Sequence, residues 1–321
     1  MLNPAVEARL DSLHEHYTHA NPFPHVVIDD FFAAHYADSL LADFPAFEKG
    51  NALTEMGKLG KKSVNRDIEA ISDSYRQLAE WLVSDRFIDM MQRITGIDNL
   101  IAIPGGAGGT HESRSGADLA PHLDYNYVDY EGEALHRRLN VLFYLNKDWD
   151  PSWGGNFEVH SDPQHPSKNE FQKFGPNFNR VIVMETSERS WHGYDPIRLP
   201  NPDTQSRKSI SIYLFSRTRP EEQIAPRHST FYAMRPLPEH IKADHTLNKD
   251  DMHAIQTGIA KRDRWIMHYQ REVLRFSAKA EKQEKKAAWL QAQRLKQQEA
   301  SKGFWGRLSY VLKGTKQPES D

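Results

Sequence analysis

Cysteine is absent from the 321 residues of this chain. Its absence excludes disulfide bonds, thiolate catalysis, cysteine-ligated zinc and iron–sulfur clusters, so metal chemistry has to use histidine, aspartate and glutamate. The chain has 16 histidines, which makes such ligands plentiful but also makes chance pairs common. A chain of this length is enough for one large domain with appendages or for two domains.

Long apolar runs are also missing. No stretch approaches the roughly 18 residues that a membrane span needs. Residues 1–17 carry Glu7 and Asp11 in place of the basic residues of a secretory signal, and no apolar segment follows them. We therefore expect a cytoplasmic protein.

The net charge is only −3, but it is unevenly distributed. Residues 1–260 contain 26 basic and 37 acidic residues, whereas residues 261–321 contain 15 basic and 7 acidic residues. An acidic body is therefore followed by a basic tail, where an anionic membrane or a nucleic acid would bind. We expect no nucleic-acid partner, because the body has no basic stripe.

The pattern of apolar residues divides the chain into helical and strand-rich parts. The first hundred residues predict four helices and one strand; the strand covers 24–29, and the helices cover 5–16, 33–43, 74–83 and 86–94. Short β-branched or aromatic runs separated by turn residues then predict strands at 100–104, 118–123, 138–146, 156–160, 179–185 and 208–216. Short strands at this spacing, with helices beside them, favour a sandwich or barrel of the α+β class.

After residue 250 the pattern becomes helical again. Apolar residues recur in steps of three and four up to about residue 300, interrupted by Arg262 and Gln283. A coiled-coil seam that lets 250–295 self-associate and a long helix packed along the body are both consistent with this pattern. In the basic amphipathic tail, 301–321, apolar residues fall on one helical face, which suits either a peripheral membrane contact or a docked capping helix.

The candidate metal ligands begin with a His-x-Asp pair at the end of a predicted strand, His122 and Asp124. A second such pair, His160 and Asp162, makes the motif weak by itself. In a metal-binding jelly roll, however, a second histidine arrives several strands after the first pair. Three predicted strands separate His122 from His192, whereas one separates His160 from His192, so we prefer His122, Asp124 and His192.

Two neutral imidazoles and one carboxylate are the ligand set of non-heme Fe(II) oxygenases, because they leave three adjacent positions open for a 2-oxo acid and O2. Arg207 opens the strand after His192 and could hold the distal carboxylate of such an acid through a planar two-point contact. Ser209 and Tyr144 could each add a hydroxyl group.

The chain resembles the Fe(II)- and 2-oxoglutarate-dependent oxygenases of the prolyl-hydroxylase type, in particular bacterial members. The resemblance extends over residues 20–218 and rests on the segments 23–29 and 138–150, on Trp153-Gly154-Gly155, and on the site residues named above. It implies a double-stranded β-helix, or jelly roll, with Fe(II) held by His122, Asp124 and His192, and with 2-oxoglutarate bound by Arg207, Ser209 and Tyr144. Ascorbate is an optional further cofactor.

On this basis we divide the chain into an oxygenase domain, 1–220, a helical extension, 221–300, and the tail. Within the domain, 1–97 supply helical support and 98–220 form the jelly-roll core. The glycine-rich segment 104–110 is interpreted as a flexible loop at the cavity mouth, since it lacks the Gly-Lys-Ser/Thr of a phosphate-binding loop.

The resemblance implies hydroxylation of an unactivated C–H bond, with 2-oxoglutarate and O2 converted to succinate and CO2. Substrates of similar bacterial members suggest a sugar, a lipid-linked compound such as a lipopolysaccharide sugar, or another small molecule. If the tail binds the inner face of the membrane, a glycolipid substrate would follow. A peptidyl hydroxylase and a non-catalytic jelly-roll binding protein are the alternatives. The candidate substrate residues flank the ligands or lie on nearby turns: Asn126, Tyr127, His136, Arg189 and Trp191.

Overall fold

The computed structural model describes residues 1–48, 60–105, 108–238, 240–300, 303 and 305. The chain separates into two compact units, residues 1–236 and residues 237–321. The candidate ligands all belong to the first unit.

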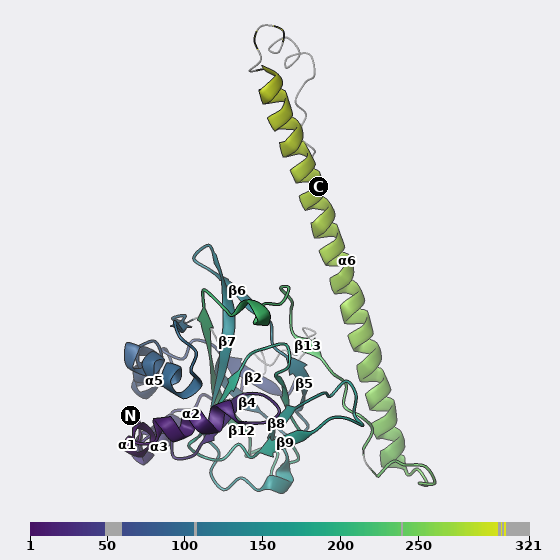
Figure 1. The fold of residues 1–321 in the computed structure, drawn as a ribbon. Helices are drawn as coiled ribbons and strands as arrows, with labels where there is room; N and C mark the ends of the chain where they lie inside the picture. Colours follow the sequence, from purple (N-terminus) through teal and green to yellow (C-terminus); the bar gives the residue numbers. More distant parts are fainter. Residues whose placement is uncertain (49–59, 106–107, 239, 301–302, 304, 306–321) are drawn as a thin grey trace. The chain divides into compact units, whose positions relative to one another are not determined.

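The described α-helices of the first unit all lie before the third strand, with the strands 25–28 and 62–65 between them (Figure 1). They are α1 (Pro4–Glu7), α2 (Leu10–Thr18), α3 (Ala34–Ala42), α4 (Asp73–Leu82) and α5 (Asp85–Thr95). Serine hydroxyls cap two of them: Ser72 accepts a hydrogen bond from the amide of Tyr75 in α4, and Ser84 accepts one from Phe87 in α5. Helix α5 ends at Gly96, whose φ of 69° is the left-handed conformation that glycine adopts most easily.

Two antiparallel sheets form the rest of the first unit. The larger sheet has the order β1-β10-β7-β12-β4-β2, with β3 paired to β12 and β6 paired to β7. Its strands are β1 (His25–Ile28), β2 (Lys62–Asn65), β3 (Ile101–Ala102), β4 (Gly109–Ser113), β6 (Tyr127–Tyr130), β7 (Glu133–Tyr144), β10 (Arg180–Glu185) and β12 (Arg207–Ser216). The smaller sheet has the order β13-β5-β11-β8-β9. Its strands are β5 (Leu119–Leu123), β8 (Phe157–His160), β9 (Phe171–Phe174), β11 (Trp191–Tyr194) and β13 (Phe231–Tyr232).

Apolar and polar residues alternate along β12, so one face of the larger sheet is apolar and the other is polar at this strand. Ile210, Ile212 and Leu214 belong to the apolar core shared with the helices, whereas Ser209 and Ser211 line a cavity on the other face. Successive residues of a strand point to opposite faces, so a single strand serves both the core and the cavity.

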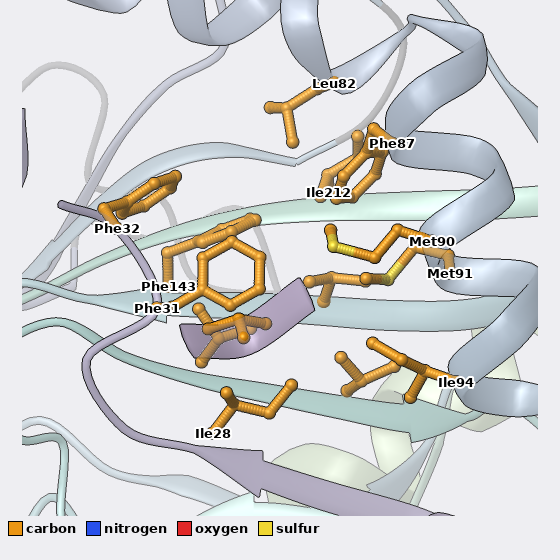
Figure 2. Packing of buried hydrophobic residues seen from close by; sticks show 14 of the residues in the cluster. Ile28, Phe31, Phe32, Leu82, Phe87, Met90, Met91, Ile94, Phe143 and Ile212 are labelled. Carbon is orange, nitrogen blue, oxygen red and sulfur yellow. The ribbon is translucent and has the colours of Figure 1, made fainter. Parts of the chain in front are cut away.

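The main core lies between the larger sheet and the helices (Figure 2). Phe31 and Phe32 follow β1 and pack on Phe143 of β7, with ring centroids 5.7 and 5.4 Å away. Met90 and Ile94 of α5 belong to the same buried cluster. Burying large side chains of this kind contributes about 1.5–3 kcal/mol each, so the helices anchor the sheet that carries the cavity.

These features confirm the predicted fold class, an α+β jelly roll with supporting N-terminal helices and a long C-terminal helix. Two details differ from the sequence-based expectation. The predicted helix 5–16 is two helices, α1 and α2, with a break at Ala8 and Arg9. The sequence pattern also missed six short strands: β2, β4, β6, β9, β11 and β13.

The second unit contains one long helix, α6 (Lys249–Ala300). Asp251 lies in its first turn and is buried, because the rings of His240 and His245 contact its carboxylate at 2.7 and 2.8 Å. Most other side chains of α6 are exposed, including several large apolar ones. None of the described helices has an apolar stretch long enough to cross a membrane. Apart from 303 and 305, the tail 301–321 is outside the described residues, and so is its predicted amphipathic helix.

Candidate active site

His122 of β5 and His192 of β11 lie directly opposite each other in the smaller sheet. Opposite residues of an antiparallel pair share a face of the sheet, and their ring centroids are accordingly 4.2 Å apart. Asp124 follows the end of β5, and its carboxylate oxygens lie 3.6 Å from Nε2 of His122 and 3.5 Å from Nε2 of His192. The structure therefore brings three potential ligands together from two neighbouring strands.

The protonation state of this cluster suits a metal ion. Nδ1 of His122 contacts the carbonyl oxygen of Ala120 at 3.0 Å, and Nδ1 of His192 contacts that of Ser190 at 2.9 Å. A carbonyl oxygen only accepts, so each Nδ1 donates to it, and each Nε2 faces Asp124 and is the nitrogen available to a metal. Burial, followed by the neighbouring His122, lowers the pKa of His192 to about 3, which keeps that imidazole neutral. Two imidazole nitrogens and one carboxylate facing one point fit Fe(II).

A buried arginine accompanies the carboxylate. Arg137 of β7 is 1% exposed, and its guanidinium lies 2.7 Å from Oδ2 of Asp124. The same guanidinium stacks on the rings of Tyr213 and Tyr125, at 3.6 and 4.5 Å from their centroids. Burial alone would raise the pKa of Asp124, but Arg137 and then His192 outweigh it and hold this pKa well below its usual range. Asp124 is therefore ionised and fixed in orientation.

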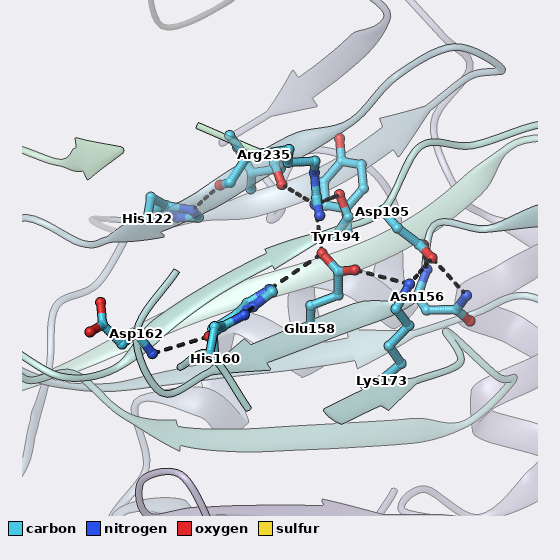
Figure 3. Close-up of polar contacts among 12 residues, drawn as sticks. His122, Asn156, Glu158, His160, Asp162, Lys173, Tyr194, Asp195 and Arg235 are labelled. Atoms are coloured by element: carbon cyan, nitrogen blue, oxygen red, sulfur yellow. Dashed lines mark hydrogen bonds and ion pairs between the residues drawn. The ribbon is translucent and has the colours of Figure 1, made fainter. Parts of the chain in front are cut away.

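The second His-x-Asp pair lies elsewhere. His160 of β8 is beside Glu158, with 3.6 Å between Nε2 and the carboxylate (Figure 3). Asp162 contacts His165 instead, at 2.8 Å. Neither His160 nor Asp162 lines the cavity that contains His122 and His192.

Arg207, Ser209 and Tyr144 come together on the larger sheet. Ser209 is the register partner of Tyr144 across β12 and β7, and a terminal guanidinium nitrogen of Arg207 donates to the hydroxyl of Tyr144 at 3.1 Å. All three side chains are buried. Nε of Arg207 donates to the carbonyl oxygen of Gly155 at 2.7 Å, and the ring of Tyr194 covers the guanidinium at 4.4 Å. The arginine is thus held rigidly with its positive charge facing the cavity.

One cavity of about 630 Å³ contains both groups. It lies between the two sheets and is lined by the His122, Asp124 and His192 cluster, by Arg207, Ser209 and Tyr144, and by residues that the sequence analysis did not select. These additional residues include Arg137, Tyr125, Tyr213, Tyr194, Tyr232, Lys62 and Arg66. A volume of this size is typical of small-molecule sites.

The five candidate substrate residues do not line this cavity. The side chain of Asn126 accepts from the amide of His228 and donates to the carbonyl oxygen of Pro226, so it fixes that segment. Tyr127 packs on His136, with ring centroids 4.6 Å apart.

The other two candidates also lie outside the cavity. Trp191 packs with Leu123 and Ala233, and Arg189 is exposed beside a separate pocket. Trp191 is the first residue of β11, on the face opposite to His192, and Arg189 lies in the turn before this strand. The alternation of a strand explains this for Trp191, which precedes His192 and therefore points the opposite way.

Comparison with known proteins finds a family model that matches the part of the chain that contains the site. Residues 109–215 match the family model described as the 2OG-Fe(II) oxygenase superfamily. The matched segment contains every proposed ligand, and over this segment the chain is similar to the superfamily. It is a 2-oxoglutarate-dependent dioxygenase with Fe(II) and 2-oxoglutarate as cofactors. No curated protein sequence matches the chain.

Several solved structures are similar at low identity. A prolyl hydroxylase from Trichoplax adhaerens, in complex with a hypoxia-inducible-factor peptide fragment, is 16% identical, covers 66% of this chain and 91% of its own, and has a TM-score of 0.46. A prolyl-4-hydroxylase from Pseudomonas putida is 14% identical, covers 65% and 100%, and has a TM-score of 0.42. HygX from Streptomyces hygroscopicus, with nickel, 2-oxoglutarate and hygromycin B bound, is 12% identical, covers 64% and 91%, and has a TM-score of 0.41.

Proposed function

We propose that the protein hydroxylates an unactivated C–H bond of a small-molecule substrate, such as a sugar or a lipid-linked sugar, with Fe(II) held by His122, Asp124 and His192. The observation that supports this most strongly is that these three side chains share one cavity with Arg207. When bound, the iron, together with 2-oxoglutarate and O2, supplies the oxidant that converts C–H to C–OH.

The chain's own residues have separate tasks in this proposal. The Nε2 atoms of His122 and His192 and the carboxylate of Asp124 would hold the metal. Arg137 keeps Asp124 ionised and oriented. Arg207 binds the distal carboxylate of 2-oxoglutarate, and Ser209 and Tyr144 donate further hydrogen bonds to it. The buried walls of the cavity exclude water from the reacting atoms.

The cavity of the first unit and the helix α6 of the second unit suggest different partners. A cavity of about 630 Å³ suits a compact substrate better than a folded protein surface, which favours the small-molecule hypothesis over peptidyl hydroxylation. The large apolar side chains that are exposed along α6 support self-association through 250–295. A membrane contact would involve 301–321, most of which is outside the described residues.

Metal binding and 2-oxoglutarate turnover test the ligand assignment. We expect His122→Ala and Asp124→Ala to abolish both Fe(II) binding and the slow conversion of 2-oxoglutarate to succinate that occurs without substrate. The matched control is His160→Ala, which removes a buried histidine from the neighbouring strand pair but leaves the cavity intact. Melting curves of all variants establish that they are folded. Full turnover in His122→Ala would show that the assignment is wrong, and loss in His160→Ala alone would move the site to the other pair.

A further inference from the structure

The second unit contains a cluster of potential metal ligands that the proposed chemistry does not use. His240 and His245 precede α6, and Asp251 lies in the first turn of this helix. Nε2 of His240 lies 2.7 Å from Oδ1 of Asp251, and Nε2 of His245 lies 2.8 Å from Oδ2. Each of the three side chains offers one ligand atom, and these atoms all lie within 4.8 Å of one another. Two imidazoles and a carboxylate thus converge within the short segment 240–251.

The position of the carboxylate is fixed by the start of α6. The side-chain oxygen of Asn248 accepts hydrogen bonds from the amides of Asp250 and Asp251, at 2.8 and 2.9 Å. The amide of Asn248 in turn donates to Oδ2 of Asp251 at 3.0 Å. This reciprocal cap holds the carboxylate, and Asp251 is only 3% exposed. Capping requires the carboxylate but not the two imidazoles, so it explains one member of the cluster and leaves the two histidines unexplained.

The rings of His240 and His245 approach the carboxylate from different directions. Their planes are inclined by 80°, and their centroids are 5.5 Å apart. In a tetrahedral site, Zn–N distances of about 2.0–2.1 Å and Zn–O distances of about 2.0–2.2 Å place neighbouring ligand atoms about 3.4 Å apart. The separations of 2.7 and 2.8 Å would therefore have to increase by roughly half an ångström. The two histidine side chains are 59% and 29% exposed, so rotation of either ring can provide this displacement.

The tautomers of the two imidazoles allow a metal ion to replace their hydrogen bonds. An ionised carboxylate only accepts, so Nε2 of each ring donates to Asp251. Coordination requires the lone pair of Nε2, and the proton of a neutral imidazole then resides on Nδ1. Neither Nδ1 makes a hydrogen bond to another residue that the structure describes, so each is available to carry this proton.

We propose that His240, His245 and Asp251 form a second metal site, which binds Zn(II) with a water molecule as the fourth ligand. Two imidazole nitrogens and one carboxylate oxygen are ligands that Zn(II) accepts, whereas Mg(II) and Ca(II) favour oxygen ligands. The ion would join the segment before α6 to the first turn of the helix. This inference goes beyond the proposed function and does not rest on it, because all three ligands lie in the second unit.

Counting bound zinc tests the site. The full chain is dialysed to equilibrium against Zn(II), and the metal bound per chain is measured by atomic absorption. We expect the wild type to bind two ions, one at the proposed iron ligands of the first unit and one at the second site. His240→Gln and His245→Gln should each bind the second ion at least about tenfold more weakly, because losing a direct ligand costs at least as much affinity as losing the partner of a ligand. The matched control is His253→Gln, which removes an exposed histidine of α6 outside the cluster and should bind two ions.

Hydrogen exchange provides a readout that a hydrogen-bonded helix cap alone would not change. A ligand that binds only the closed form slows exchange in proportion to its occupancy, so free Zn(II) at ten times its dissociation constant should slow amide exchange in 240–252 about tenfold. We expect this effect in the wild type and in His253→Gln but not in His245→Gln. Circular dichroism of the metal-free variants establishes that α6 is intact in each of them.

The outcomes separate this inference from the proposed function. If His122→Ala still binds two ions while His240→Gln and His245→Gln each lose one, the ligand assignment in the first unit fails and the second site stands. If the wild type binds a single ion that is lost in His122→Ala, or if zinc binding is the same in His240→Gln, His245→Gln and the wild type, the second site is overturned. The cluster is then a hydrogen-bonded helix cap only. The same conclusion follows if Zn(II) leaves amide exchange in 240–252 of the wild type unchanged.

Discussion

At the scale of single residues, Arg137 is the feature that most affects the proposed metal ligands. It is almost completely buried, yet its strand position does not predict that it faces the cavity. Leu139, Val141 and Phe143 on the same strand belong to the helix-facing core, and strict alternation would place Arg137 with them. The register shifts here: Leu139 pairs with Leu214, but Arg137 pairs with Phe215. This bulge turns Arg137 toward Asp124.

We expect Arg137→Gln to weaken metal binding about 10–100-fold, as is typical when the partner of a metal ligand is removed. The physical reason is that Asp124 loses the cation that keeps it ionised and oriented. Titration with Fe(II) or Mn(II) measures the effect. Arg138→Gln is the matched control, because Arg138 is also buried but bonds to Ser216 and Thr218 rather than to Asp124. Wild-type metal affinity in folded Arg137→Gln would contradict the positioning role.

Arg207 provides the second prediction at this scale. Truncating one partner of a buried charge pair costs about 2–5 kcal/mol. Arg207→Ala should therefore weaken 2-oxoglutarate binding roughly 30-fold to several-thousand-fold, while metal binding persists. Equilibrium binding of 2-oxoglutarate to the metal-loaded protein is the measurement, and Arg198→Ala, which removes an exposed arginine, is the control. Should the loss occur in Arg198→Ala instead, the carboxylate anchor has been misplaced.

At the scale of elements, β8 shows how the smaller sheet is stabilised behind the ligands. Glu158 is 3% exposed and lies 2.6 Å from Arg235, which also donates to the carbonyl oxygens of Leu119 and Tyr194 (Figure 3). Lys173 of β9 lies 3.2 Å from the same carboxylate. The arginine therefore joins β5, β8 and β11, the strands that flank and carry His122 and His192.

This cluster predicts a specific pH dependence of stability. Burial alone would raise the pKa of Glu158, but His160, Arg235 and Lys173 outweigh it and lower the pKa from 4.5 to about 2. A carboxyl group whose pKa falls on folding stabilises the folded state above the unfolded pKa, and this contribution is lost as the pH falls from about 4.5 toward 2. We expect Glu158→Gln to destabilise the protein by about 1–3 kcal/mol at pH 7, since Arg235 loses its partner. The difference in free energy of unfolding between this variant and the wild type should decrease as the pH falls from about 4.5 toward 2.

Denaturant unfolding at several pH values tests the prediction. Glu170→Gln is the control, because Glu170 is exposed and directly precedes β9, the strand that pairs with β8. It should follow the wild type at every pH. If the free energies of unfolding of the wild type and of Glu158→Gln differed by the same amount from pH 7 to pH 3, the carboxylate charge would not be what stabilises the sheet.

The same elements explain what could be predicted from the sequence. Strands β7 and β12 were predictable, because apolar residues alternate along them, and β10 was predictable because four apolar residues follow each other in it. The relation of Tyr144 to Arg207 follows from β7 and β12. Strand β2 was not, since four residues at a sheet edge have too little pattern. Lys62 and Arg66 were therefore missed. The candidate substrate residues were chosen for proximity in sequence, whereas strand alternation and turns direct those side chains elsewhere.

At the scale of the whole molecule, α6 is the part that the proposed chemistry does not explain. It has 52 residues, which corresponds to a length of about 78 Å. Met252, Ile259, Ile266 and Val273 follow each other at intervals of seven and are 43–63% exposed. A seven-residue apolar repeat is the pattern of a coiled coil. Coiled coils have a second apolar position three residues after the first, and Phe276, three residues after Val273, and Leu290, two repeats later, occupy it. A second copy of this helix would bury the stripe.

We expect the full chain to self-associate through this stripe. Ile266→Gln combined with Val273→Gln should lower the mass measured by sedimentation velocity to that of the monomer, because two apolar seam positions become polar. The control is Arg264→Gln combined with Arg271→Gln, which changes the opposite helix face and should leave association intact. The proposed metal and 2-oxoglutarate residues all lie before residue 237, so 2-oxoglutarate turnover should be the same in both double variants. A wild-type chain that remains monomeric at high concentration, or a seam variant that associates as the wild type does, would show that the repeat has another role.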